Sequence, residues 1–161
     1  MLAGKMMCTF NHVGMAVPEC DAAVEWYTRT LGLHQLGSTR YVPGEYIPPT
    51  SMFRRSGKPL EAIKVAFLLG SGGVGLELVE FIRGSEAGNE PSSPHFSGDL
   101  YHVALTVEDP GGVAEAIAGS GGTKIGEVAK MPSGVSFVHC LDPWGNALEL
   151  MSGTLEQLVG A

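Results

Sequence analysis

The chain lacks any run of basic residues and any long apolar segment. It has 161 residues and a formal net charge of −7, so it offers no positively charged surface of the kind that binds a phosphate backbone. No apolar stretch approaches the roughly 20 residues that a membrane-spanning helix needs. Residues 1–7 lack the apolar core of a secretion signal. We therefore expect no nucleic-acid partner, no membrane anchor and a cytoplasmic location.

Cysteine is also scarce. The three cysteines, Cys8, Cys20 and Cys140, are an odd number at irregular spacing. This pattern is typical of reduced thiols in the cytoplasm rather than of a disulfide framework, and it lacks the short paired spacing of a structural zinc site. With 44 % apolar and 17 % charged residues, the composition is that of an ordinary globular protein. The chain is long enough for one well-packed domain or two small fused modules.

The most informative feature that is present is an approximate internal repeat. Residues 10–17 (FNHVGMAV) resemble residues 100–107 (LYHVALTV), and residues 75–78 (GLEL) resemble residues 147–150 (ALEL). Each copy therefore opens with a strand that carries a histidine and closes with a short apolar strand that carries a glutamate.

A helix is expected after the first strand of each copy. In the first copy it begins near Asp21 and ends at Gly32, with an apolar face formed by Val24, Tyr27 and Leu31. In the second copy Asp109 can cap the helix and Pro110 suits its first turn. The buried face expected there consists of Val113, Ala116 and Ile117.

Three strands are expected after each helix, approximately over residues 34–42, 61–70 and 74–82 in the first copy and 123–130, 134–141 and 146–151 in the second. Both copies therefore have the order β-α-β-β-β, which indicates an α+β fold. We expect a single domain over residues 1–161, made of module one (9–83), a linker (84–98), module two (99–152) and a tail (153–161) with a short helix near 154–159. The first copy is longer, mostly between residues 44 and 60, and long loops inside compact domains are often functional.

The histidines and glutamates of the repeat are candidate metal ligands. Ionisable side chains on apolar strands are costly to bury unless they are paired or coordinate an ion. Imidazole nitrogen and carboxylate oxygen suit Zn, Ni, Co, Mn or Fe, and two carboxylates balance the charge of one divalent ion. We interpret His12, Glu77, His102 and Glu149 as ligands of one such ion. Two separate His–Glu ion pairs, one in each module, are the alternative.

Four stretches of the chain resemble the vicinal oxygen chelate superfamily. This group includes lactoylglutathione lyase, methylmalonyl-CoA epimerase, extradiol dioxygenases, and fosfomycin and bleomycin resistance proteins, and the similar stretches are residues 11–18, 26–32, 101–103 and 142–150. The resemblance implies that the two modules form a half-open β-barrel around a divalent metal, with ligands at His12, Glu77, His102 and Glu149. It also implies a homodimer.

Within the superfamily, the resemblance favours the metal-dependent isomerases, epimerases and lyases. Extradiol dioxygenases use two histidines and one carboxylate, and Glu77 would fill a position that they leave open. Bleomycin-type binding modules lack the metal residues. The implied reaction removes a proton next to a carbonyl of a small substrate (a hemithioacetal, an acyl-CoA or a sugar-derived ketone), with the metal stabilising the enediolate and Glu77 or Glu149 moving the proton. A resistance protein that binds a metabolite or an antibiotic, and a ring-cleaving dioxygenase, are the alternatives.

Further candidates lie around this set. His139 is expected on a strand beside the site, where it could contact substrate or donate a proton, or else have a structural role at a dimer interface. Compared with methylmalonyl-CoA epimerase, the second acid falls on Leu60 rather than on a carboxylate, so loop residue Glu45 is a candidate substitute. Arg54 and Arg55 of the long loop could bind an anionic substrate, and a solvated loop surface is the alternative for them.

Overall fold

The computed structural model describes residues 10–47, 60–83 and 102–159. The chain divides into two compact units, one of residues 1–28 and 32–93 and the other of residues 94–161 together with 29–31. Each unit has its own four-stranded sheet. No helix in the described ranges is long and apolar enough to cross a membrane.

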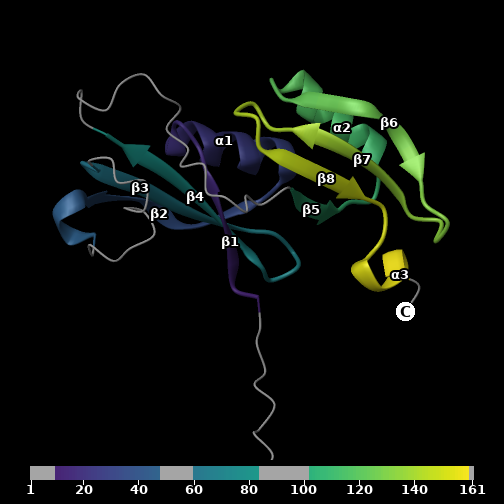
Figure 1. The fold of residues 1–161 in the computed structure, drawn as a ribbon, viewed down its shortest axis with the longest axis horizontal. Coiled ribbons are helices and arrows are strands. Elements are labelled where there is room, and N and C mark those ends of the chain that lie inside the picture. The colour runs from purple at the N-terminus through teal and green to yellow at the C-terminus, as the bar shows by residue number, and fades with distance from the viewer. Residues whose placement is uncertain (1–9, 48–59, 84–101, 160–161) are drawn as a thin grey trace, which may run out of the picture. The chain divides into compact units, whose positions relative to one another are not determined.

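Unit one is a four-stranded sheet with the strand order β1-β4-β3-β2 (Figure 1). Strands β1 and β4 run parallel, and the other neighbouring strands are antiparallel. Its elements are β1 (His12–Ala16), α1 (Cys20–Leu31, of which residues 29–31 are grouped with unit two), β2 (His34–Pro43), the 3-10 turn η1 (Gly44–Tyr46), β3 (Ala62–Leu69) and β4 (Gly75–Ile82).

Unit two repeats this topology with the strand order β5-β8-β7-β6 (Figure 1). Strands β5 and β8 are parallel, and the remaining pairs are antiparallel. Its elements are β5 (Val103–Thr106), α2 (Pro110–Gly119), β6 (Thr123–Lys130), β7 (Ser136–Leu141), β8 (Ala147–Met151) and the tail helix α3 (Leu155–Val159). The predicted α+β class and the two β-α-β-β-β modules are therefore confirmed.

The duplication extends to an irregularity in the second strand of each unit. The register of β2 on β3 shifts between Leu36 and Arg40, and that of β6 on β7 shifts between Ile125 and Ala129. Gly37 and Gly126 lie inside these bulges with φ of 73° and 71°, a backbone conformation that side chains with a Cβ disfavour. Glycine is therefore suited to both positions.

Helix α1 is joined to one face of its sheet by polar contacts as well as by packing. The backbone N–H of Cys20 donates to Glu80 of β4 at 2.9 Å, which satisfies one of the free donors at the helix start. Lys64 of β3 donates to Asp21 at 3.0 Å, and this ion pair holds the pKa of Asp21 below its usual value. The alternation of strand side chains then places Glu77 of β4 on the opposite face of the sheet.

Helix α2 covers the corresponding face of unit two. It lies against β6, β7 and β8, and Lys124 of β6 donates to Glu115 of the helix at 2.9 Å. Lys124 pairs in register with Cys140 of β7, so Cys140 is on the helix side. His139 and Glu149 are therefore on the face that the helix does not cover.

The predicted buried faces of the helices were partly wrong. In α1 the buried residues are Cys20, Ala23, Trp26 and Tyr27, whereas Val24 and Leu31 are only half-buried. In α2 Ala114 and Ile117 are buried and Ala116 is exposed. Both stripes are rotated from the expected ones, so that small residues (Ala23 in α1 and Ala114 in α2) are fully buried.

The helix ends agree better with expectation. Gly32 ends α1 with φ of 66°, and the N–H groups of Gly32 and Leu33 donate to carbonyls of the last turn. Asp109 is at the N-cap position of α2 as predicted, but its side chain makes no capping hydrogen bond there. In the tail, Thr154 and Gln157 exchange side chain to backbone hydrogen bonds at the start of α3, which is a capping box.

The extra length of module one lies between β2 and β3, as the sequence predicts. Gly44 and Glu61 join the two ends of this connection by a backbone hydrogen bond of 2.6 Å. A Cβ on residue 44 would collide with the carbonyl oxygens of Leu60 and Glu61, so the close approach requires glycine. Ile47 and Leu60 then pack on the face of the sheet that carries Glu77, in a buried cluster with Ile63, Val65, Val79 and Phe81.

Candidate metal centre

In unit one a histidine and a glutamate meet on the face of the sheet away from α1. Glu77 of β4 pairs in register with Gly14 of β1, and His12 lies two residues before Gly14 on the same face. His12 Nε2 lies 3.5 Å from Glu77 Oε2, with side-chain exposures of 40 % and 17 %. A Cβ at position 14 would lie 3.4 Å from Glu77 Oε2, which is a van der Waals contact, and Ala104 carries a Cβ at the equivalent position beside Glu149.

Asn11 orients the imidazole of this pair. His12 Nδ1 lies 2.7 Å from Asn11 Oδ1, and because a carbonyl oxygen only accepts, Nδ1 carries the proton. The lone pair is then on Nε2, the nitrogen that faces Glu77. This is the arrangement by which hydrogen-bonded histidines present one nitrogen to a metal.

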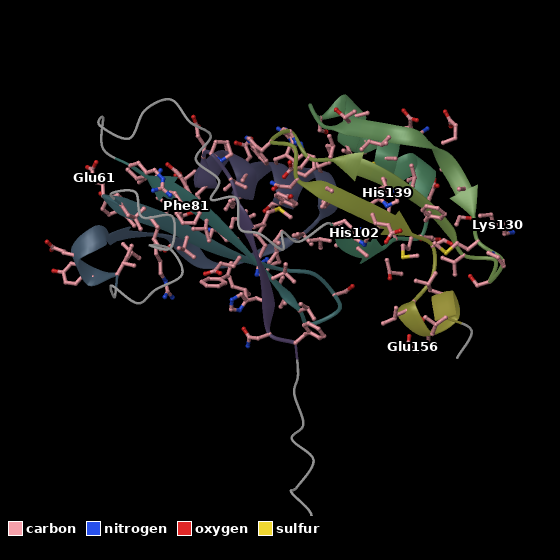
Figure 2. The ribbon with its side chains drawn as sticks, viewed as in Figure 1. Glu61, Phe81, His102, Lys130, His139 and Glu156 are labelled. Atoms are coloured by element: carbon pink, nitrogen blue, oxygen red, sulfur yellow. The ribbon has the colours of Figure 1, made fainter. Side chains whose placement is uncertain are left out.

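In unit two the equivalent pair is joined by a second histidine. His102 Nε2 lies 3.2 Å from Glu149 Oε2, and His139 Nε2 lies 3.6 Å from Glu149 Oε1. Ligand atoms of the three residues all lie within 4.8 Å of one another. Both imidazoles are about one-third exposed, at 31 % and 32 %, while the Glu149 side chain is 12 % exposed. Figure 2 shows the two histidine side chains close together.

The two sites occupy equivalent places in the duplicated fold. Glu77 pairs with Gly14 and Phe67, and Glu149 pairs with Ala104 and His139. The ring contacts correspond as well, since the His12 and Phe67 centroids are 5.8 Å apart and those of His102 and His139 are 5.9 Å apart. Opposite the glutamate, unit one has the apolar ring of Phe67 where unit two has the imidazole of His139.

Apolar side chains lie next to each His–Glu contact on the same face of the sheet. In unit one Glu77 is followed two and four residues later by Val79 and Phe81 of the buried cluster. In unit two the ring of Phe137 lies edge-on to His139 at 5.7 Å. Such surroundings exclude water from part of each site, which strengthens the electrostatic interactions of the carboxylate.

A buried aspartate holds the turn that sets the register of His139 against Glu149. Asp142 is 2 % exposed, and its Oδ1 accepts hydrogen bonds from the backbone N–H groups of Trp144 at 3.0 Å and Asn146 at 2.7 Å. The turn joins β7 to β8, so it determines which residue of β7 lies opposite Glu149. With the observed register that residue is His139.

The remaining predicted residues lie apart from these contacts or outside the described residues. Glu45 is in η1 and is exposed. Arg54 and Arg55 fall outside the described ranges, so the structure does not place them. Sequence reasoning placed His139 beside the site but missed its contact with Glu149, and it missed Asn11 as the partner of His12. Alternation of side chains along residues 136–141 was the available signal for His139.

The described cysteines lie on the helix side of the sheets. Cys20 and Cys140 are free and fully buried. Burial, followed by the nearby carboxylates of Asp21 and Glu80, raises the pKa of the Cys20 thiol to about 11, and burial also raises that of Cys140. Both remain thiols at neutral pH, and neither shares a face with the His–Glu contacts.

The described donor atoms fit a divalent transition metal. Each imidazole nitrogen lies 3.2–3.6 Å from a carboxylate oxygen. Ligands about 2.1 Å from one ion lie roughly 3.0–3.4 Å apart, so small shifts bring these atoms to bonding geometry. Neutral imidazole and carboxylate suit Zn, Mn, Fe, Co and Ni rather than an all-thiolate ion.

Comparison with known proteins identifies the family. The model of the glyoxalase/bleomycin resistance protein/dioxygenase superfamily matches residues 9–150. The chain belongs to this superfamily, as its resemblance to vicinal oxygen chelate proteins predicts. A comparison with curated protein sequences found no significant match.

Solved structures with this fold include enzymes and a resistance protein. A glyoxalase family protein from Bacillus cereus has a TM-score of 0.70 and 19 % identity, covering 94 % of this chain and 97 % of its own. A lactoylglutathione lyase from Agrobacterium tumefaciens has a TM-score of 0.58 and 19 % identity, with coverages of 98 % and 100 %. A fosfomycin resistance protein from Listeria monocytogenes has a TM-score of 0.59 and 15 % identity, with coverages of 96 % and 98 %. At these identities the likeness shows the fold alone.

Proposed function

We propose that the protein is a metal-dependent isomerase, epimerase or lyase that removes a proton next to a carbonyl group of a small oxygenated substrate. The observation that carries this proposal is the matched placement of His12 with Glu77 and of His102 with Glu149, at equivalent register positions in both units. A repeated structural ion pair would need only mutual contact. The partial exposure of each imidazole favours a site that is open to an ion and a substrate.

The proposed ligand set is His12, Glu77, His102 and Glu149. A divalent ion bound there would act as a Lewis acid toward a substrate carbonyl oxygen. Glu149, at 12 % exposure, is the better shielded of the two carboxylates, and the imidazoles that face it are placed to hold its orientation. We assign it the proton transfer, with Glu77 as the alternative base. The neighbouring apolar side chains would limit access of water to the carboxylate.

Metal content and proton exchange test this function. Purified untagged protein, reconstituted with each candidate metal, should retain close to one equivalent after dialysis. In D₂O it should incorporate deuterium into at least one member of a panel of hemithioacetals, acyl-CoA thioesters and α-hydroxy ketones. Glu149→Gln should abolish incorporation, whereas Glu156→Gln, on the exposed tail helix, should not. Less than a tenth of an equivalent of every metal would overturn the proposal.

One variant distinguishes the proposed enzyme from a protein that only binds its ligand. If the protein only sequesters a hydrophobic metabolite, Glu77→Ala should leave ligand affinity unchanged. In an enzyme of the proposed class the same change should reduce both metal content and turnover.

A second candidate function is supported by the triad of unit two. Two histidines and one carboxylate on one face form the donor set of non-haem iron oxygenases, and His102, His139 and Glu149 are such a set. Ring cleavage of a catechol would then consume oxygen only when ferrous iron is present. Oxygen uptake with a catechol panel, compared between Fe²⁺ and Zn²⁺ forms, distinguishes this reaction from proton transfer.

The proposal also includes one domain, a homodimer and a cytoplasmic location. The superfamily commonly forms dimers, and β1, β2, β5 and β6 are edge strands of the described sheets, which can pair with a second copy. The free, buried state of Cys20 and Cys140 is compatible with a reducing compartment. Light scattering coupled to size-exclusion chromatography measures the oligomeric state.

A further inference from the structure

Among the described residues, three candidate metal-binding side chains come together within unit two alone. His102 precedes β5, His139 is on β7 and Glu149 is on β8, so three neighbouring segments of one sheet supply the donors. Glu149 uses one oxygen toward each imidazole, at 3.2 Å and 3.6 Å. The three ligand atoms are within 4.8 Å of one another without any residue of unit one.

Unit one has the same fold, so its equivalent positions can be compared with this group of unit two. Phe67 occupies in unit one the position that His139 occupies in unit two, opposite the glutamate in the register of the third and fourth strands. Both rings meet the first-strand histidine edge-on at nearly the same distance. The fold thus accepts an apolar ring at this position, and packing alone does not require an imidazole.

We propose that His139 is a metal ligand, and that unit two holds an ion with three of its own residues. This inference rests on the proposed function and assigns the ion's principal binding site to His102, His139 and Glu149. Two imidazoles and one carboxylate leave one negative charge on the donor set, which suits a divalent cation. Partial exposure of both imidazoles leaves a path for the ion to enter.

A purely structural role for His139 makes a different prediction. As a partner of Glu149 at 3.6 Å, beyond ordinary hydrogen-bond length, it would contribute to stability and to orientation of the carboxylate. Loss of such an orienting residue typically lowers metal affinity about 10–100-fold. The number of imidazoles bound to the ion would not change, so counting them separates the two roles.

The experiment uses the full chain with Co²⁺ as the probe. Solvent-exchangeable N–H signals of cobalt-bound imidazoles are shifted far downfield in proton NMR, and their number gives the number of bound histidines. The unit-one pair is removed in His12→Ala/Glu77→Ala. We expect this double variant to bind one Co²⁺ and to show two shifted N–H signals, from His102 and His139.

His139→Phe introduces the residue that unit one has at this position. On the double-variant background it should lower Co²⁺ affinity more than about 100-fold, beyond the usual range for an orienting residue. In the otherwise natural chain it should remove one shifted N–H signal. His34→Phe, on exposed β2, is the matched control and should change neither quantity. Circular dichroism of each variant reports folding, and the signal count of the unmodified chain does not depend on any variant.

The outcomes separate the inference from the function on which it rests. If the unmodified chain binds no Co²⁺ or other candidate metal, the proposed function fails. If it binds Co²⁺ but the double variant does not, while His139→Phe retains every shifted N–H signal, the function stands and the role of His139 is refuted. Retention of two signals in the double variant, and loss of one with His139→Phe, supports the inference.

Discussion

At the scale of single residues, Asn11 orients the imidazole of His12. Its Oδ1 lies 2.7 Å from His12 Nδ1, so the opposite nitrogen faces Glu77. Because this bond selects the tautomer that can bind a metal, Asn11→Ala should weaken Co²⁺ binding by the unit-one pair about 10-fold or more. Titration of chains that carry His102→Ala and Glu149→Ala isolates this pair. Asn11→Asp retains an acceptor oxygen and should lose less; equal losses in both variants would contradict the assigned role.

Cys20 makes a separate residue-scale prediction about alkaline pH. In the unfolded chain its thiol ionises near the usual pKa of 9.0, whereas burial raises the folded value to about 11. Its contribution to stability is therefore complete below pH 9 and is lost as pH rises from about 9 to 11. The loss from one proton is at most about 1.4 kcal/mol per pH unit.

Urea denaturation between pH 8 and 11 measures this dependence. Cys20→Ala should flatten the alkaline decline in the free energy of unfolding, although Cys140 retains a smaller share. An unchanged slope in this variant would refute the contribution of Cys20. Iodoacetamide should modify neither buried thiol in the native protein at pH 8 at an appreciable rate, and both after unfolding.

At the scale of elements, the turn between β7 and β8 links stability to the site. Asp142 accepts two backbone N–H groups through Oδ1, and its Oδ2 accepts from the Asn146 side chain at 2.8 Å. Asp142→Ala should cost roughly 1–3 kcal/mol, because buried donors lose their partner. A shift of one residue in this hairpin would move His139 to the helix side of the sheet, so Co²⁺ affinity should fall in the same variant.

Asn146→Ala is the milder comparison for this turn. It removes the side-chain bond to Asp142 and leaves both backbone hydrogen bonds, so we expect a smaller loss of stability and little change in Co²⁺ affinity. Thermal unfolding and cobalt titration measure the two effects. If Asp142→Ala unfolds more easily yet retains full affinity, the turn does not set the geometry of the triad.

At the scale of the whole molecule, a bound ion should stabilise the chain. Binding to the folded state alone, at a free metal concentration 100 times the Kd, contributes about 2.7 kcal/mol. For a chain of this size that corresponds to a rise in Tm of roughly 5–11 °C. Calorimetry with and without Zn²⁺ measures the shift, and excess chelator should reverse it. Glu149→Gln should remove most of the rise, and a full rise in that variant would place the ion elsewhere.

Much of the fold could be predicted because it depends on local patterns. The strand over residues 123–130, the strand that ends at residue 141 and the helix stop at Gly32 are properties of short segments, and the structure agrees with them. The rotated buried faces of the helices could not be predicted in the same way. Which side of α2 is buried depends on how closely its backbone approaches the sheet, and Ala114 rather than Ala116 faces it.

The candidate site, too, could be predicted only where it depends on local sequence. The repeat identifies His12 with Glu77 and His102 with Glu149, because duplicated strands keep the same residue types at equivalent positions. Glu80 was not singled out, although it accepts a hydrogen bond from the first turn of α1. Its role depends on where a helix 60 residues away in the chain is placed, which no local pattern encodes.

By itself the sequence determined the order of the elements, the two halves and the His and Glu pair in each, because periodicity and repetition are properties of the order of residues. Only the tertiary structure decided that His139 reaches Glu149 while Phe67 takes the same place beside Glu77, and that Asn11 orients His12. These contacts depend on strand register and turn geometry, which bring together side chains that are remote or unremarkable in the sequence.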